Sequence, residues 1–395
     1  MRFFSGYRCG KCGRDVPAGS IAGECPTCCG PLLGVYDTGL LRRNMSRGEF
    51  LTGDGDGVWR YSPLLPVFPR MISLGEGNTP LLHVERLGSL IGVPYLYIKD
   101  ESLNPTGSFK ARGMAVAVSR LLDLGARDVC MASAGNAGLS LSAYCAFAGI
   151  RCAIYIPSDS PLGVAEECRA YGADVVEVIG ILPDAARRME EESESGMRFA
   201  VNTFREPCRV EGKKTMAFEI ERQSGGKTPD WILFPTGGGT GIVALWKAYS
   251  ELAELGWLDA RPPRLAAVQS TGCAPVVKAF ETGSEEVIPW DDPDTIASGI
   301  RVPSSRADSL ILRALRESGG TAVAVSDDSI LDAVREVSLH AGVFPSPEGA
   351  ATWAGLKHLV ESGEIDGSSR IVMVITAGGS RYRFLDEIYS GRMRG

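Results

Sequence analysis

The sequence predicts an α/β protein with two open, parallel-sheet domains behind a small cysteine-bearing segment. Three observations support this prediction. Apolar, strand-like runs alternate with helical patterns, glycine-rich loops follow several of these runs, and two Cys-x-x-Cys pairs stand near the N-terminus. Nearly continuous apolar strands are typical of parallel sheets that helices cover on both faces. The 395 residues are enough for two or three domains.

The composition is that of an ordinary globular protein. Hydrophobic residues make up 44% of the chain and charged residues 23%. The net charge of −7 argues against nucleic acid as the main partner, because phosphate binding needs a basic surface. No apolar run reaches membrane-spanning length, and "MRFFSGYRCG" has no signal-peptide core, so we expect a cytoplasmic protein. The eleven cysteines are then better explained as metal ligands or buried thiols than as disulfides.

Residues 1–45 are predicted to form a zinc-ribbon-like segment and a linker. Cys9 and Cys12 lie in "CGKC", and Cys25 and Cys28 lie in "CPTC". Two such knuckles, with glycine and proline around them, are typical of four thiolates that hold a structural zinc ion. Three interpretations stay open: a brace for the N-terminus, a binding site for nucleic acid or a partner, and a ribbon that has lost its metal. Cys29 is a fifth thiol, next to Cys28, and could take its place as a ligand.

The remaining chain is predicted to alternate between strands and helices. We expect a large domain from 46–112 and 219–395, with a smaller α/β domain, 113–218, inserted into it. Strands are expected in "YLYIK", "DVCMA", "RCAIYIP", "DVVEV", "DWILFP", "RLAAVQS" and "IVMVI". Helices are expected in "ARGMAVAVSRLLDLGA", "NAGLSLSAYCAFAG", "LGVAEECRAYGA", "LPDAARRMEEESES" and "TGIVALWKAYSELAEL".

Four segments follow predicted strands and carry the chemistry. They are "SAGNAG" (133–138), "PTGGGTG" (235–241), "TAGGS" (376–380) and the stretch "NPTGSFKARG" (104–113) with Lys110. Ligands of open α/β sheets bind beyond the carboxyl ends of the strands. The sequence therefore predicts that these four segments converge on one crevice.

The glycine-rich stretch 235–241 is predicted to hold a phosphate group. It lies between a strand and a helix, where glycines let the backbone approach an anion and the helix dipole favours it. The loop has no Gly-Lys-Ser/Thr and is not a Walker A motif. "GTGIVA" fits a dinucleotide fingerprint, but the following strand "RLAAVQS" ends without the acidic residue that a ribose requires. A purely structural turn is the other alternative.

Lys110 is the candidate nucleophile. An amine beside a phosphate site can form a Schiff base with a cofactor aldehyde, and burial would lower its pKa and raise its reactivity. The alternative is an ordinary surface lysine. In "SAGNAG", Asn136 offers a hydrogen bond to a ring hydroxyl or a carboxylate, and Ser133 offers one to an anion. The alternative for Asn136 is a helix cap.

Several motifs together resemble one enzyme family. They are "LGEGNTPL" (74–81), "NPTGSFKARG", "SAGNAG", "PTGGGTG" and "VNTFREPCRVEGKKT" (201–215), and the resemblance covers roughly residues 70–380. The chain resembles the fold-type-II pyridoxal-phosphate enzymes, which have a tryptophan synthase β-like fold and include threonine synthases, threonine dehydratases and cysteine synthases. It looks most like the threonine synthases. The resemblance implies a carbon–oxygen lyase of amino-acid biosynthesis that uses pyridoxal 5′-phosphate.

The resemblance also implies roles for individual residues. Lys110 would carry the Schiff base, and Asn136 would bond the cofactor's O3′. Thr376 would face the pyridine nitrogen and leave it unprotonated, which suits elimination and replacement; the alternative is a β-branched strand residue. The cofactor's phosphate would be held by Gly237, Gly238, Gly239, Thr240 and Gly241.

The implied substrate is O-phosphohomoserine, which threonine synthases convert with water to threonine and phosphate by γ-elimination and β-addition. Its phosphate asks for cations and hydroxyls. The candidates are Arg112, Ser133, Asn202, Thr203, Arg205 and Arg209. Surface salt bridges are the alternative role for each arginine.

The sequence departs from the family in two places. Ala111 stands where threonine synthases carry an aspartate, and "TAGGSRYRF" differs from their usual ending. Three alternatives therefore stay open: β-replacement on O-phosphoserine as in cysteate or cysteine synthases, dehydratase-like deamination, and a non-catalytic binding protein. Glu348 in "PSPEGAA" is either a helix cap or a residue near the cofactor. We expect a homodimer, the commonest closed assembly.

Overall fold

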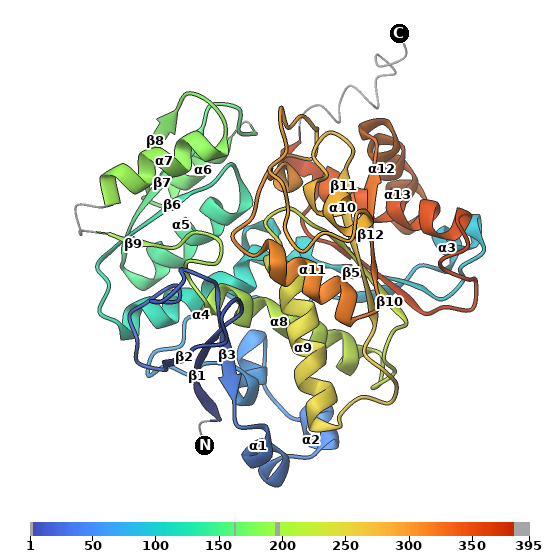
Figure 1. Cartoon of the computed structure of the whole chain (residues 1–395), viewed down its shortest axis with the longest axis horizontal. Coiled ribbons are helices and arrows are strands. Elements are labelled where there is room, and N and C mark those ends of the chain that lie inside the picture. The colour runs from blue at the N-terminus through green and yellow to red at the C-terminus, as the bar shows by residue number, and fades with distance from the viewer. Residues whose placement is uncertain (1–2, 162, 194–197, 383–395) are drawn as a thin grey trace. The chain divides into compact units, whose positions relative to one another are not determined.

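The computed structural model describes residues 3–161, 163–193 and 198–382. The chain forms two compact units (Figure 1). Unit 1 contains residues 1–78, 104–226 and 243–259, and unit 2 contains residues 79–103, 227–242 and 260–395. These units are not the domains that we predicted from the sequence, and the predicted domain bounds stay a prediction. Within the described ranges, no helix is both long and apolar enough to cross a bilayer.

Unit 1 begins with a small antiparallel sheet that bears the cysteines. Its strand order is β2-β1-β3, with bounds β1 (Phe4–Cys9), β2 (Asp15–Pro17) and β3 (Leu32–Tyr36). This sheet packs on helix α4 (Lys110–Asp123) through a buried apolar cluster that includes Tyr7, Leu32, Val116 and Ala117. Two short helices follow the sheet, α1 (Thr38–Asn44) and α2 (Arg47–Thr52).

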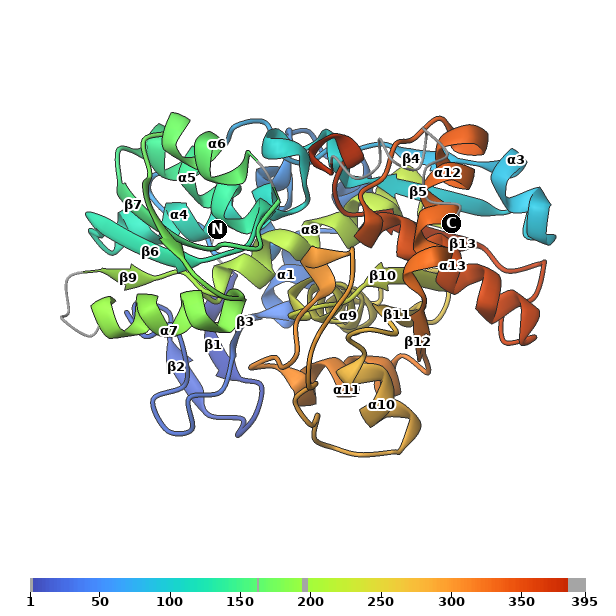
Figure 2. The same ribbon diagram turned by 90° about the horizontal axis from the view of Figure 1, so that it is seen from above.

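A four-stranded parallel sheet forms the centre of unit 1. Its order is β8-β7-β6-β9, with bounds β6 (Asp128–Ala132), β7 (Arg151–Pro157), β8 (Asp174–Val178) and β9 (Phe199–Ala200). Helices α5 (Asn136–Ala148) and α7 (Leu182–Ser193) lie on opposite faces of the sheet (Figure 2), so the strands are apolar on both sides. The helices of unit 1 that complete this layer are α4, α5 (Asn136–Ala148), α6 (Val164–Ala170), α7 (Leu182–Ser193) and α8 (Cys208–Gln223).

Unit 2 contains a six-stranded sheet of order β12-β11-β10-β13-β5-β4. Neighbouring strands are parallel except at the edge, where β4 runs antiparallel to β5. The bounds are β4 (Leu81–His83), β5 (Leu96–Asp100), β10 (Trp231–Pro235), β11 (Arg264–Ser270), β12 (Thr321–Val325) and β13 (Ile371–Ile375).

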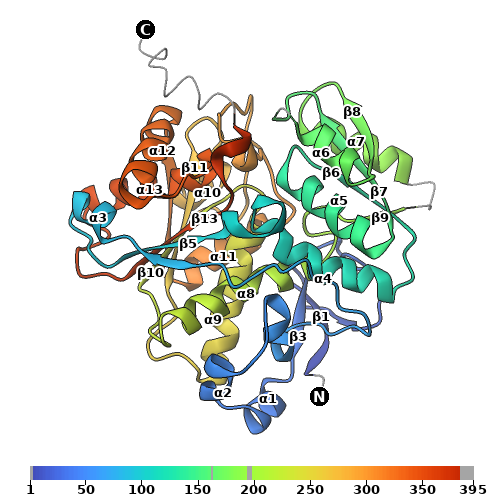
Figure 3. The ribbon, with the colours of Figure 1, turned by 180° about the vertical axis from the view of Figure 1, so that it is seen from behind.

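Helices cover the six-stranded sheet. Helix α13 packs against α12 and against strands β10 and β13 (Figure 3), and its Trp353 is fully buried in the core. The helices of unit 2 have the bounds α3 (Glu85–Gly88), α10 (Pro275–Glu281), α11 (Asp308–Glu317), α12 (Asp327–Ala341) and α13 (Pro347–Glu361). Helix α9 (Thr240–Leu255) follows β10 directly. The predicted fold class, two parallel-sheet α/β bodies behind a cysteine-bearing segment, is confirmed.

Candidate active site

Lys110 is the first residue of helix α4 and is half-buried. A tight turn precedes it, in which Thr106 and Gly107 both have positive φ, 60° and 67°, and the N–H of Gly107 donates to the carbonyl of Asn104 at 2.9 Å. Glycine adopts this left-handed conformation without steric cost, which explains its presence there. The Nζ of Lys110 lies 4.6 Å from the centroid of the Phe109 ring.

Two of the family-like motifs are joined by hydrogen bonds within unit 1. The Oδ1 of Asn104 accepts from the N–H of Gly77 at 3.0 Å. The Oε1 of Glu219 accepts from the N–H of Asn78 at 2.8 Å. The turn before Lys110 is thereby fixed to the "GEGN" segment and to helix α8.

Arg112 lies in the interior of unit 1. Its Nη1 and Nη2 donate to the two carboxylate oxygens of Glu219, both at 2.7 Å, and both side chains are fully buried. Its Nη1 also donates to Thr215 Oγ1 at 3.0 Å. A buried, bidentate pair of this kind is strongly directional, and breaking it is costly. The structure thus gives Arg112 a positioning role, and its contact with substrate stays a prediction.

The "SAGNAG" loop follows β6 and is organised by Ser133. The Oγ of Ser133 accepts from the N–H groups of Gly135 at 3.2 Å and Gly138 at 2.9 Å. Helix α5 starts at Asn136, and its N-cap residue is Gly135. Asn136 therefore does not occupy the cap position that the alternative interpretation gave it, and its side chain is half-buried.

Residues 202–209 run beside this loop. The Oδ1 of Asn202 accepts from the N–H of Ala132 at 3.2 Å, which places Asn202 next to the residue that precedes Ser133. Thr203 is half-buried. Arg205 pairs with Glu190 at 2.9 Å, and its Nε lies 4.0 Å from a carboxylate oxygen of Glu24. Arg205 thus already faces two acidic groups.

Arg209 is almost completely buried on helix α8. Its Nη1 donates to the carbonyl of Val201 at 2.5 Å, and its backbone N–H donates to Glu206 at 2.9 Å. Burial lowers the pKa of its guanidinium to about 10, against the opposing charge of Glu206. In the part of the chain that the structure describes, its Nε is buried and has no hydrogen-bond partner. The Oγ of Ser108, two residues before Lys110, is a second buried polar atom in that state.

The glycine loop lies in unit 2, between β10 and α9. Its Gly239 has φ +80°, and a Cβ there would lie 2.2 Å from Ile311. A Cβ on Gly241 would lie 2.1 Å from the Phe234 ring. Ser305 fixes the loop by donating from Oγ to the carbonyl of Gly238 at 3.0 Å. The first N–H groups of a helix have no acceptors within it, and the helix dipole favours an anion there, so this loop suits a phosphate.

Glu348 holds Gly299, which packs against the glycine loop. Its Oε1 accepts from the N–H of Gly299 at 2.6 Å, and both carboxylate oxygens accept from the hydroxyl of Tyr382, at 3.0 and 2.9 Å. A Cβ on Gly237 would lie 2.9 Å from the carbonyl of Gly299. The N-cap of α13 is Ser346, so the cap interpretation of Glu348 is wrong. No signal in the sequence joins these three distant segments.

Thr376 directly follows β13 and is buried. Strand β13 lies between β10 and β5, and all three are parallel. The glycine loop and Thr376 therefore lie at the same edge of the six-stranded sheet. Lys110 and "SAGNAG" belong to unit 1, and the convergence of all four segments stays a prediction.

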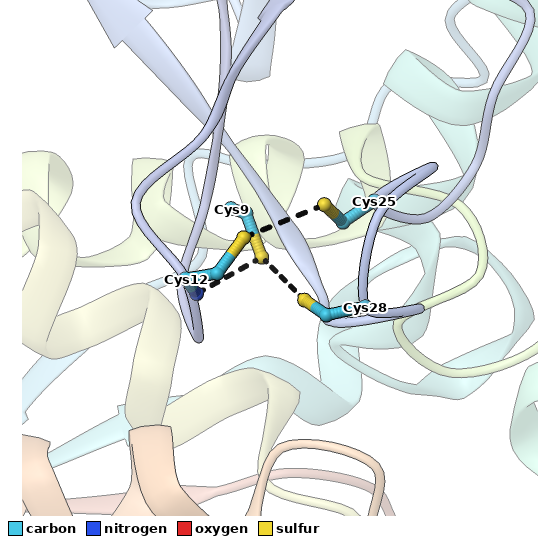
Figure 4. Close-up of side chains that lie close together, drawn as sticks. All are labelled: Cys9, Cys12, Cys25 and Cys28. Carbon is cyan, nitrogen blue, oxygen red and sulfur yellow. Dashed lines mark hydrogen bonds between the residues drawn. The ribbon is translucent and has the colours of Figure 1, made fainter.

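Cys9, Cys12, Cys25 and Cys28 come together at one end of the small sheet (Figure 4). All four sulfur atoms lie within 4.8 Å of one another, with Cys9–Cys28 at 3.5 Å and Cys12–Cys25 at 3.7 Å. A tetrahedral zinc ion with bonds of about 2.3 Å separates its sulfur ligands by about 3.8 Å, so the four thiols fit zinc. Cys29 is exposed and lies outside the cluster.

Known proteins resemble this chain over most of its length. Residues 72–377 match the family model "Pyridoxal-phosphate dependent enzyme". A threonine synthase of Methanocaldococcus jannaschii is 38% identical over 94% of this chain and 92% of that protein. A threonine synthase of Methanosarcina acetivorans is 36% identical over 94% of this chain and 90% of that protein.

Solved structures share the fold. The processed form of threonine deaminase isoform 2 from Solanum lycopersicum has a TM-score of 0.67 at 24% identity, over 79% of this chain and 82% of that one. A fungal L-serine ammonia-lyase from Rhizomucor miehei has a TM-score of 0.67 at 22% identity, over 80% of this chain and 98% of that one. Both likenesses concern the fold alone.

The family match and the relation to threonine synthases make this chain a pyridoxal-phosphate-dependent enzyme of the carbon–oxygen lyase class. Within that class, the chain belongs to the threonine synthase family.

Proposed function

We propose that this enzyme converts O-phosphohomoserine and water to threonine and phosphate. The observation that carries the proposal is the relation to two threonine synthases over more than nine-tenths of this chain. The buried Nε of Arg209, which has no acceptor among the described residues, adds to it, because an enzyme for a phosphate ester needs a cationic donor inside its site.

We assign the cofactor contacts as follows. Lys110 would hold the cofactor's aldehyde carbon covalently, Asn136 would bond its ring hydroxyl, and Thr376 would meet its pyridine nitrogen without protonating it. When bound, pyridoxal phosphate withdraws electrons from the substrate and makes its Cα and Cβ protons acidic. The 5′-phosphate is assigned to the N–H groups of Gly237, Gly238, Gly239, Thr240 and Gly241.

Lys110 also moves protons in this proposal. Its amine removes the protons at Cα and Cβ, so that the bond between Cγ and the phosphate oxygen breaks and inorganic phosphate leaves. One proton returns to Cγ, the oxygen of water forms a bond to Cβ as the water gives up a proton, and one proton returns to Cα; the remaining proton leaves with the phosphate. The start of α4 is fixed by the Asn104 and Glu219 contacts, which hold the amine in place for these steps.

The substrate phosphate is assigned to the region of Ser133, Asn202 and Arg209. Ser133 and Asn202 lie side by side, because Asn202 bonds the backbone immediately before Ser133. Arg112 and Arg205 already pair with carboxylates, so Arg209 is our main cationic contact among the predicted residues. Arg112, Thr203 and Arg205 are proposed to shape the site around it.

The experiment is a turnover assay on the holoenzyme. O-phosphohomoserine should yield threonine and inorganic phosphate in equal amounts, and a Lys110→Ala variant should yield neither. Turnover of O-phosphoserine with sulfide or sulfite, without turnover of O-phosphohomoserine, would replace the proposal with β-replacement. Ammonia release from threonine as the main activity would replace it with deamination.

Two further assignments complete the proposal. Cys9, Cys12, Cys25 and Cys28 are proposed to hold one structural zinc ion, which metal analysis of the purified protein would count. We also expect a cytoplasmic homodimer, since dimers are the commonest closed assembly, and sedimentation measurements check the number of chains.

A further inference from the structure

We propose that Lys213 binds the phosphate group of the substrate together with Arg209 and thereby selects phosphate esters. That the phosphate belongs to an amino-acid substrate rests on the proposed function. Lys213 is not among the residues predicted from the sequence. It follows Arg209 by four positions on helix α8, so the two side chains share one face of the helix.

Lys213 and the candidate catalytic lysine both lie near the ring of Phe109. Its Nζ lies 5.2 Å from the centroid of the Phe109 ring, and the Nζ of Lys110 lies 4.6 Å from the same centroid. Gly113 allows this approach of α4 and α8, since a Cβ there would lie 2.7 Å from the carbonyl of Arg209 and 3.2 Å from the Cε of Lys213. Two amines and a guanidinium are thus gathered in the interior of unit 1.

Two cations act on Lys213 in addition to its burial. Burial, followed by the charges of Arg209 and Lys110, holds the pKa of Lys213 well below its usual value, and Glu206 opposes this only in part. The Glu206 carboxylate also serves Arg120 at 3.2 Å and the backbone N–H of Arg209 at 2.9 Å. A dianionic phosphate at this place would relieve the repulsion among the cations.

Arg209 provides the second, independent observation. Its Nε is buried and has no hydrogen-bond partner within the described ranges of the chain. Such an atom has lost its bond to water without a replacement, and a ligand that supplies an acceptor removes this cost. A phosphate oxygen is a strong acceptor for this donor, and the neighbouring ammonium of Lys213 suits a second oxygen.

The consequence is selectivity. A neutral hydroxyl on the substrate would leave the excess of buried positive charge in place, whereas a phosphate ester brings the negative charge that balances it. Lys213 therefore favours phosphorylated amino acids over serine or threonine themselves.

The test compares Lys213→Met with Lys278→Met in the holoenzyme. Methionine keeps most of the length of the side chain and removes its charge, and Lys278 is an exposed lysine on α10 that serves as the matched control. Titration with inorganic phosphate should show binding about tenfold or more weaker in Lys213→Met, because a charge-assisted bond is lost. The melting temperature without phosphate should stay the same or rise, because a buried charge is removed. Lys278→Met should change neither.

A second set of measurements separates substrate binding from an effect on Lys110. In Lys213→Met, the KM for O-phosphohomoserine should rise by about tenfold with a smaller change in kcat, and the pH dependence of the bound cofactor's absorbance should stay unchanged. Unchanged phosphate binding in both Lys213→Met and Lys213→Gln would overturn the proposal. A shifted absorbance profile with unchanged phosphate affinity would also overturn it. Weaker phosphate binding in an enzyme that does not turn over O-phosphohomoserine would retain the Lys213 site and refute the proposed reaction.

Discussion

Helix α8 carries two groups of buried charges that differ in their balance. Around Glu211 the charges match: Lys214 contacts Glu211 and Glu251 at 2.8 Å each, and Lys247 contacts the same two carboxylates. The charges that lower the pKa of Lys213 are those of two cations, Arg209 and Lys110, and Glu206 opposes them. The difference teaches that buried charges with matched partners serve the fold, whereas cations that repel one another in the interior are the place where we propose that an anion binds.

The matched group joins three parts of unit 1. Glu211 accepts from the N–H of Gly34 at 2.9 Å and from the hydroxyl of Tyr36 at 2.7 Å, both on strand β3. Lys247 and Glu251 come from helix α9. The network therefore fixes the cysteine-bearing sheet to α8 and to the C-terminal half of α9.

The largest expected effect comes from breaking the matched group. Lys214→Met leaves two buried carboxylates with one lysine, and we expect a loss of about 3–5 kcal/mol in the free energy of unfolding. Chemical denaturation measures it. Lys213→Met is the matched comparison on the same helix, and an equal loss in that variant would contradict the distinction between the two groups.

Acid should weaken the matched group next. Burial would raise the pKa of Glu211, but Lys214 and Lys247 outweigh it and lower the value to about 2, from 4.5 for an ordinary glutamate. The stabilisation is therefore complete above pH 4.5 and is lost as the pH falls toward 2, by on the order of 3 kcal/mol. Denaturation curves at several pH values should show this slope in the wild type and not in Glu211→Gln; equal slopes would refute it.

Removing metal from the cysteine cluster should have a smaller effect. Arg120 donates to the carbonyls of Ser20 and Ala22, at 2.8 and 3.1 Å, and also pairs with Glu206. Chelation or Cys12→Ser should lower the free energy of unfolding by about 2 kcal/mol, less than zinc gives an isolated finger, because the sheet also packs on α4. The KM for substrate should also rise, because Arg120 links this segment to Glu206, and Glu206 in turn holds the backbone of Arg209. Cys29→Ser, outside the cluster, is the control and should change nothing.

The smallest expected effect concerns Glu348 in unit 2, where neutral donors satisfy a buried carboxylate. Glu348→Gln keeps the shape and weakens the bonds from Gly299 and Tyr382, so we expect a cost of about 1 kcal/mol and a few-fold weaker cofactor binding. Cofactor titration followed by absorbance measures the affinity. Unchanged affinity would show that Gly299 does not support the glycine loop.

The apolar strands were predictable from the sequence. "RLAAVQS" and "RCAIYIP" form β11 and β7 with the expected bounds, because both faces of each sheet are covered. Helix α9 also has the predicted bounds. The spacing of the two Cys-x-x-Cys pairs was enough to predict the cluster of four cysteines.

Helix α8 was not predictable in this way. Its Arg209, Lys213 and Glu219 are charged and yet buried, so the helix lacks the apolar stripe by which a packed helix is recognised. Its charges are explained only by partners far away in the chain, such as Arg112 for Glu219. The support of Gly237 by Gly299 and Glu348 is equally invisible, since it depends on tertiary contacts.

The most direct test of the account is to locate the amine that binds the cofactor. Borohydride reduction of the holoenzyme, followed by digestion and mass spectrometry, should place the reduced pyridoxyl group on Lys110, and the Lys110→Ala variant should remain unlabelled. A label on any other lysine would contradict the assignment of Lys110 as the catalytic residue. The most informative such result is a label on Lys213, whose buried amine also lies near the Phe109 ring.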